Sequence, residues 1–312
     1  MAIDIVLLLV GGFGVWLGAE GLVKGAVKLA KYLGVSSLVV GFTVVAFGTS
    51  APELVVSAFA AFQGHAAIAL GNVVGSNIFN ICLVLGLSAL IAPVNVHPEV
   101  LSRDIPLVLA ATFLALALAY FGNQVDRVDG IILLTFFTAH TVMSYRIAKR
   151  DQARITEAGW KRPKLEAKHI AYLVGGMALL AVGAEAMVRG AVGVAEALGI
   201  SQRIIGMTIV AFGTSVPELA ASVVAARHGE SDLSLGNVVG SNIYNLLLIL
   251  GVTGLIAPIP SGLAAGISVD FIFFVISAVL LYPLARIGRT VGRIDGALLV
   301  LVYAVFYFFL FI

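Results

Sequence analysis

The sequence is poor in charged residues. Only 12% of its 312 residues are Asp, Glu, Lys or Arg, whereas 60% are hydrophobic and the mean hydropathy is +1.07. A soluble domain normally contains about 25% charged residues. The composition therefore excludes a soluble globular protein and indicates an integral membrane protein. The chain has a single cysteine, Cys82, so it forms no internal disulfide.

The sequence also lacks the alternation of polar and apolar residues that membrane barrel strands show. Its apolar runs last about 20 residues or more, the length of a helix that crosses a hydrocarbon core about 30 Å thick. The first run has no basic region before it and no clear cleavage site, so we expect it to be retained as a span. The ten predicted spans cover residues 3–31, 37–63, 67–92, 104–121, 128–147, 168–198, 203–227, 232–256, 267–286 and 294–312.

Lysine and arginine are unevenly distributed along the chain. The only long polar segment, residues 149–167, separates the first five spans from the last five. If this segment is cytoplasmic, sixteen of the nineteen basic residues lie on the cytoplasmic side, as the positive-inside rule requires. We therefore expect a multi-pass protein of the cell (inner) membrane, with a cytoplasmic linker at 149–167 and both termini outside.

One stretch of sequence occurs twice. Residues 41–93 and 206–258 align without a gap at an offset of 165, and 32 of the 53 positions are identical. The motif GTSAPE returns as GTSVPE, and GNVVGSN returns unchanged, each time followed by another Asn. Because each half has five spans, an odd number, the second half must be inverted relative to the first. Inverted repeats are typical of secondary transporters, which bind substrate near the midplane where the halves meet.

The fold class predicted from this pattern is an all-α polytopic membrane protein. Its ten transmembrane helices form two inverted five-helix repeats, residues 1–148 and 168–312, which together make one transport domain. Helices 2 and 7 should break at the GTSxPE motif, because Pro52 lacks an N–H donor and crowds the carbonyl four residues before it. Backbone groups freed within a membrane need protein, water or ions as partners.

The residues around the break are all oxygen ligands, the kind that Ca²⁺ and Na⁺ prefer. The candidates in the first repeat are the carbonyls of Ala46 and Phe47, the hydroxyls of Thr49 and Ser50, and the carboxylate of Glu53. The next span adds a polar stripe at four-residue spacing, formed by Asn72, Ser76 and Asn80 and repeated as Asn237, Ser241 and Asn245. An alternative role for Asn72, Asn77, Asn237 and Asn242 is hydrogen bonding between helices.

Both copies together place Glu53 and Glu218 in one cavity, with no Lys or Arg at that depth. A buried carboxylate in a membrane costs several kcal/mol unless it is protonated or paired. One Ca²⁺, two Na⁺ or two protons would neutralise the pair. Binding of one kind of cation in the cavity therefore excludes the others, which makes exchange of one cation for another physically natural. Two hypotheses result: Na⁺-driven and H⁺-driven Ca²⁺ antiport. An ion channel would use similar ligands, but duplicated sites deep within inverted halves favour alternating access.

A remote alternative is an intramembrane serine hydrolase that uses Ser50 or Ser215 as its nucleophile. Such a nucleophile needs a general base within reach, and the apolar part of the motifs contains no His or Lys. We therefore expect no enzymatic activity. Two other repeated features have simpler explanations: Glu20 and Glu185 form i, i+4 ion pairs with Lys24 and Arg189, and Asp104 and Asp270 are residues at helix starts.

The motifs closely resemble those of the sodium/calcium exchanger family, in the cation/calcium antiporter superfamily and of prokaryotic type, and the resemblance extends over all ten spans. It implies that both repeats contribute ligands to neighbouring Na⁺ and Ca²⁺ sites. The implied ligands are Thr49, Ser50, Glu53, Ser76 and Asn80, their partners Thr214, Ser215, Glu218, Ser241 and Asn245, and the carbonyls of Ala46 and Ala211.

The resemblance also implies Na⁺ as the driving ion, with Na⁺ and Ca²⁺ as transported substrates, the lipid bilayer as surroundings, and neither a cofactor nor a nucleic-acid partner. It implies that spans one and six slide as a pair against the other eight. Some relatives have Asp where this chain has Asn245. An Asp there accompanies K⁺ dependence in one branch, so Asn245 favours K⁺-independent exchange.

Overall fold

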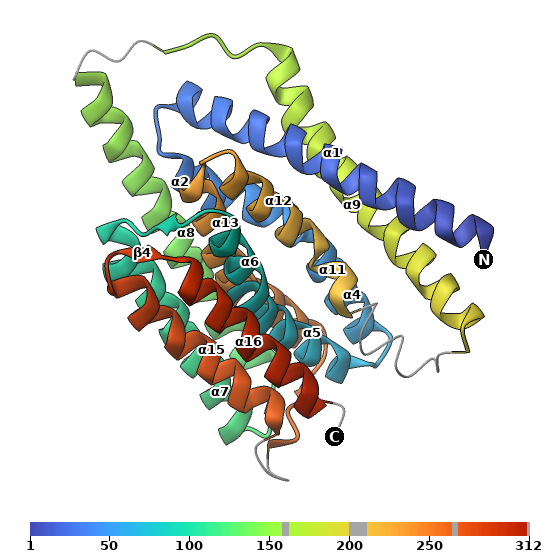
Figure 1. Ribbon diagram of the computed structural model, residues 1–312. Helices are drawn as coiled ribbons and strands as arrows, with labels where there is room; N and C mark the ends of the chain where they lie inside the picture. Colours follow the sequence, from blue (N-terminus) through green and yellow to red (C-terminus); the bar gives the residue numbers. More distant parts are fainter. Residues whose placement is uncertain (158–161, 200–210, 264–267, 311–312) are drawn as a thin grey trace.

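The computed structural model describes residues 1–157, 162–199, 211–263 and 268–310, and it is almost entirely helical (Figure 1). The first half contains α1 (Ala2–Leu33), α2 (Ser37–Val40), η1 (Gly41–Val45), α3 (Ala46–Thr49), α4 (Ala51–Phe62), α5 (Ala66–Ile78), η2 (Phe79–Leu85), α6 (Gly86–Ile91), β1 (Val94–Asn95), η3 (Val100–Asp104), α7 (Ile105–Phe121), β2 (Gln124–Val125) and α8 (Arg127–Glu157). The second contains α9 (Ala167–Ala197), α11 (Ala211–Thr214), α12 (Val216–Arg227), α13 (Ser231–Ile243), η5 (Tyr244–Ile249), α14 (Leu250–Ile256), β3 (Ile259–Pro260), α15 (Val269–Arg286), β4 (Thr290–Val291) and α16 (Arg293–Leu310).

Within the described residues, eight helices are long and apolar enough to cross a membrane, and the bent pair Ser37–Thr49 and Ala51–Phe62 supplies a ninth span. These confirm the predicted polytopic helical fold. The first part of the predicted span 203–227, up to residue 210, lies outside the described residues, and α11 and α12 form the rest. Both described chain ends lie at one end of the helices, and the end of α8 and the start of α9 lie at the other (Figure 1). We call these ends the terminal side and the linker side.

One boundary differs from the sequence prediction. The linker was expected to start at residue 149, but α8 continues to Glu157, and α9 begins at Ala167. Residues 148–157 contain neither Pro nor Gly, the two residues that most strongly end a helix, so α8 continues beyond its apolar part. Charge alone marks where a helix leaves the membrane, and it does not mark where the helix ends.

The helices α1 and α9 form an antiparallel pair along one side of the molecule (Figure 1). A Cβ atom at Gly18 would lie 2.7 Å from the backbone nitrogen of Leu180, and one at Gly183 would lie 2.7 Å from that of Val15. The two backbones are therefore in direct contact, as small residues allow in membranes. The glycines recur every seven residues on both helices, at Gly11, Gly18 and Gly25 and at Gly176, Gly183 and Gly190.

Two short β-ladders connect the halves at opposite ends of the molecule. On the linker side β1 pairs with β4, with Val94 opposite Val291, and on the terminal side β2 pairs with β3, with Val125 opposite Ile259. The two pairs are equivalent under the repeat, because Val94 corresponds to Ile259 at the offset of 165 and Val125 corresponds to Val291 at the offset of 166. The structure therefore has the inverted symmetry that the sequence predicts, and both ladders of the described residues join one half to the other.

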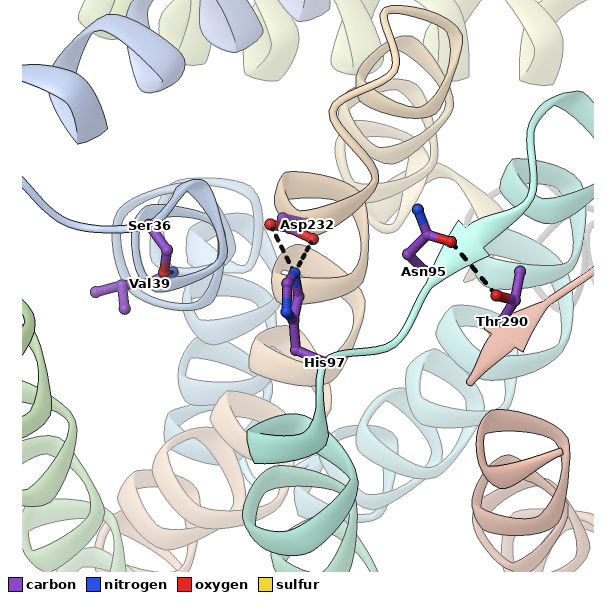
Figure 2. A network of polar contacts seen from close by, with 6 residues as sticks. All are labelled: Ser36, Val39, Asn95, His97, Asp232 and Thr290. Carbon is purple, nitrogen blue, oxygen red and sulfur yellow. Dashed lines mark hydrogen bonds and ion pairs between the residues drawn. The ribbon is translucent and has the colours of Figure 1, made fainter. Parts of the chain in front are cut away.

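A further contact between the halves lies beside the linker-side ladder. His97 Nε2 lies 3.0 and 3.1 Å from the two carboxylate oxygens of Asp232, and Thr290 Oγ1 donates to Asn95 Oδ1 at 3.3 Å (Figure 2). The centre of the molecule is formed by α5 to α6 and α13 to α14. In the apolar window of each of these two spans 72% of the residues are buried, whereas the other six long described helices have 11–39% buried.

Candidate cation-binding site

The predicted helix break is present in both repeats. The helices on either side of Ser50 meet at an angle of 43°. Ser50 has φ −84° and ψ 2°, and its counterpart Ser215 has φ −97° and ψ 6°. In each case proline is the second residue of the following helix, α4 or α12, where its missing N–H costs no helical hydrogen bond. A new helix therefore begins one residue after the break, with the proline in its first turn.

Glu53 and Glu218 begin these second half-helices, and both are 1% exposed. Each accepts a hydrogen bond from the serine at the other repeat's break: Ser50 Oγ donates to Glu218 Oε1 at 3.0 Å, and Ser215 Oγ donates to Glu53 Oε1 at 3.1 Å. The two bonds are equivalent under the repeat symmetry. They bring the two breaks together at one site, as the sequence predicts.

The second oxygen of each carboxylate, Oε2, is buried and accepts no hydrogen bond from the described residues. No described Lys, Arg or His forms a salt bridge with Glu53 or Glu218. An unsatisfied buried acceptor costs about 1–3 kcal/mol, and more when it is charged. A cation between the two carboxylates would compensate this cost.

Asn80 and Asn245 add a second symmetric pair of acceptors. Both side chains are 1% exposed, and both Oδ1 atoms lack a hydrogen bond from the described residues. Each Asn is the second residue of a π-helical segment, η2 or η5. Such segments are rare and occur frequently at functional sites, because the wider turn changes the direction of side chains and backbone groups. The sequence stripe predicted these asparagines, and it did not predict the π-helical segments.

The remaining predicted ligands lie close to these groups. Ser76 Oγ lies 3.2 Å from Ser215 Oγ, and Ser241 is fully buried with its hydroxyl unpaired among the described residues. Thr49 Oγ1 donates to Asn237 Oδ1 at 3.1 Å, and this hydrogen bond also joins the two repeats.

Three predicted ligands are less completely described. The Ala46 carbonyl accepts the Ser50 N–H at 2.9 Å, so the break does not free it as expected. Thr214 is the last residue of α11, and Ala211 is the first. The environment of the Ala211 side chain lies outside the described residues.

A second layer of polar residues holds the half-helices against the polar stripes. Asn72 Nδ2 donates to Ser57 Oγ at 2.9 Å, and Asn237 Nδ2 donates to Ser222 Oγ at the same distance. These bonds support the helix-to-helix role considered for the two asparagines, although Asn237 also contacts Thr49. Sequence reasoning missed the two serines. Their signal was present, because each lies four residues after the motif glutamate in both repeats.

Two cavities related by the repeat flank the site, and they differ in size. On the terminal side a cavity of about 220 Å³ contains Asp270, Phe306 and Ser76 in its lining. Its counterpart on the linker side, around Asp104 and Phe42, has only about 20 Å³. The Phe42 ring packs against the His140 ring with 5.0 Å between centroids. The terminal-side cavity therefore reaches Ser76, a predicted ligand. On the linker side a cavity of about 380 Å³ adjoins the small one, but its described lining includes none of the predicted ligands.

Inverted repeats, paired broken helices and buried oxygen ligands at their meeting point define a secondary transporter for cations. The family model described as "Sodium/calcium exchanger protein" matches residues 3–146 and 168–312, once for each half. The chain belongs to the sodium/calcium exchanger family.

Individual relatives agree with this assignment over the full length of the chain. The chain is 37% identical over 318 residues to the putative antiporter CaxA of Alkalimonas amylolytica, covering 100% of this chain and 99% of that protein. It is 34% identical to the sodium/calcium exchanger MaX1 of Methanosarcina acetivorans, with the same coverage. A structure of the sodium-calcium exchanger NCX_Mj matches with a TM-score of 0.83 at 33% identity, covering 97% of both chains. These relatives are transporters, so the serine hydrolase alternative is rejected.

Proposed function

We propose that this protein exchanges Na⁺ for Ca²⁺ across the cell membrane by alternating access, without a requirement for K⁺. The site between Glu53 and Glu218 binds either Ca²⁺ or Na⁺. The observation that carries the proposal is the reciprocal pair of hydrogen bonds, at 3.0 and 3.1 Å, that joins each serine to the opposite glutamate. These bonds hold two carboxylates at one buried position. The second oxygen of each carboxylate accepts no hydrogen bond from a described residue.

The charge at the site supports exchange as opposed to one-way binding. Two ionised carboxylates carry −2, which one Ca²⁺ or two Na⁺ neutralise. Moving the empty, charged site through the membrane would expose an uncompensated charge to low dielectric, which costs several kcal/mol. The protein therefore changes its accessible side readily only when loaded, and loading with one ion on one side is coupled to release of the other.

The positive-inside distribution supports an orientation with the terminal side outside and the linker in the cytoplasm. In this orientation the described conformation faces outward, since the cavity whose lining includes Ser76 lies on the terminal side. The closely packed pair α1 and α9 is the moving element of the proposal. The antiparallel backbones contact one another at Gly18 and Gly183, so they move as one body against the remaining helices.

Two features bear on ion selectivity. Asn245 is neutral where an Asp would add a third carboxylate, which supports exchange that does not need K⁺. All described ligands near the site are oxygen atoms, which suit Na⁺ and Ca²⁺. H⁺-driven Ca²⁺ antiport on the same scaffold is the competing hypothesis, because two carboxylates can also bind two protons.

The test is Ca²⁺ uptake into proteoliposomes loaded with Na⁺ in K⁺-free buffer. We expect uptake that requires the outward Na⁺ gradient, persists with a protonophore and does not increase when K⁺ is added. Thr253→Val is a matched control, because this buried hydroxyl bonds only its own helix, at 2.7 Å to the Ile249 carbonyl, and the variant should transport normally. Uptake that follows a pH gradient and ignores Na⁺ would establish the proton-driven alternative.

A further inference from the structure

Two aspartates at equivalent positions of the repeats have different surroundings. Asp104 is 1% exposed and is held by Arg103, whose Nε and Nη2 donate to its two carboxylate oxygens at 2.6 and 2.8 Å. Asp270, its counterpart at an offset of 166, is partly exposed, and no hydrogen bond or salt bridge joins its carboxylate to a described residue. One repeat therefore neutralises this carboxylate, and the other leaves it without a counter-charge.

Asp270 also lines the cavity of about 220 Å³ on the terminal side, and it is the only charged residue in the described lining. The walls are mostly apolar or aromatic, and include Phe79, Phe212 and Phe306. A single carboxylate within low-dielectric walls concentrates its field in the cavity and raises the local concentration of cations.

The same cavity reaches the transport site. Ser76 belongs to its lining. Ser76 Oγ lies 3.2 Å from Ser215 Oγ, and Ser215 donates to Glu53 at 3.1 Å. A cation beside Asp270 is thus separated from the buried carboxylates by this short polar chain.

The helix-start role predicted for both aspartates holds for Asp270, which lies in the first turn of α15 and interacts favourably with the helix dipole there. It is wrong for Asp104, which lies inside the continuous helix Val100–Phe121 and makes no capping bond. A helix-start role does not explain why only one of the two aspartates is paired.

We propose that Asp270 is an entry site for cations on the terminal side: it takes hydrated Ca²⁺ or Na⁺ from the solution and delivers it to the Glu53 and Glu218 site. The inference rests on the proposed function and adds a second, weaker cation site to it. On the linker side the equivalent carboxylate, that of Asp104, is already neutralised by Arg103.

The experiment measures the initial rate of Na⁺-dependent Ca²⁺ uptake against external Ca²⁺, at low and high ionic strength. For Asp270→Asn we expect the KM for external Ca²⁺ to rise about three- to tenfold at low ionic strength, with the maximal rate unchanged, because long-range attraction is lost and binding at the transport site is not. At high salt the difference should shrink, because exposed charges are screened. Asp270→Glu should stay close to the wild type.

A chemical version restores the charge after folding. Cys82 is the only cysteine and is fully buried, so Asp270→Cys offers one accessible thiol. A sulfonate-bearing methanethiosulfonate reagent should lower the KM of this variant, and a trimethylammonium-bearing one should raise it. Equal KM values for both adducts, or a wild-type KM for Asp270→Asn at low salt, would overturn the entry site. Absence of Na⁺-dependent uptake by the wild type would instead refute the proposed function.

Discussion

Replacing Glu53 with Gln changes the charge of the site and little else. The amide keeps the shape of the side chain and can still accept the 3.1 Å hydrogen bond from Ser215. What it removes is one of two negative charges on side chains that are 1% exposed. Removing one partner of a buried charged pair typically costs about 3–5 kcal/mol. At 1.4 kcal/mol per factor of ten, Ca²⁺ affinity should fall roughly 100- to 4,000-fold.

The same substitution should have the opposite effect on the ion-free protein. An ionised carboxylate without a counter-charge is costly to bury, and Glu53 Oε2 has no described hydrogen-bond donor. We therefore expect the melting temperature of Glu53→Gln without Ca²⁺ to equal or exceed that of the wild type. Glu218→Gln should behave in the same way, since the two residues are equivalent in the repeat.

The assay is thermal unfolding in detergent over a Ca²⁺ titration, combined with Ca²⁺ uptake into Na⁺-loaded proteoliposomes. The wild type should gain stability with Ca²⁺, and both variants should lose that gain and their transport. Glu185→Gln is the matched control, because its side chain is 60% exposed and pairs with Arg189 on its own helix, an arrangement that contributes about 0–1 kcal/mol. Wild-type Ca²⁺ affinity in both glutamine variants would refute the charge argument.

Three further predictions concern packing, support and selectivity. Gly176→Leu should separate the α1 and α9 pair and reduce both the melting temperature and Ca²⁺ uptake, because even a Cβ atom there would lie 2.7 Å from a carbonyl oxygen of α1. Gly175→Leu is the control and should be nearly neutral, since no described atom lies within 4 Å of a Cβ at that position. Ser222→Ala removes the acceptor 2.9 Å from Asn237 and should lower the free energy of unfolding by about 1 kcal/mol, as measured by denaturant titration. Asn245→Asp adds a third carboxylate, so its Ca²⁺ uptake should become faster when K⁺ is added, and an unchanged rate would contradict the selectivity argument.

The sequence predicted the features that follow from local chemistry and from the repeat. Pro52 lacks a backbone donor wherever the chain places it, so the helix break near Ser50 could be located without a structure. The duplicated glutamates and asparagines could be paired because the offset is constant. Inversion followed from an odd number of spans in each half. Each of these inferences depends on the identity of residues, and none depends on how distant side chains pack.

Other features depend on packing and could not be predicted. The π-helical segments that contain Asn80 and Asn245 insert extra residues into a turn, and the energy of such a turn is set by its neighbours. The reciprocal serine and glutamate bonds need the two halves in contact. The different environments of Asp104 and Asp270 depend on Arg103, because only one repeat has an arginine beside the aspartate. Repetition therefore predicts what the halves share, and the structure is required to find where they differ.

The two small ladders have a consequence for how such a protein could have arisen. Each strand pairs with a strand of the opposite half, and the pair Val94 and Val291 is equivalent under the repeat to the pair Ile259 and Val125. A half-length ancestor that inserted into the membrane in both orientations would have formed the same two ladders as a homodimer. Gene fusion would then have fixed one copy in each orientation, and afterwards each copy could acquire its own substitutions, such as the arginine that is present in only one of them.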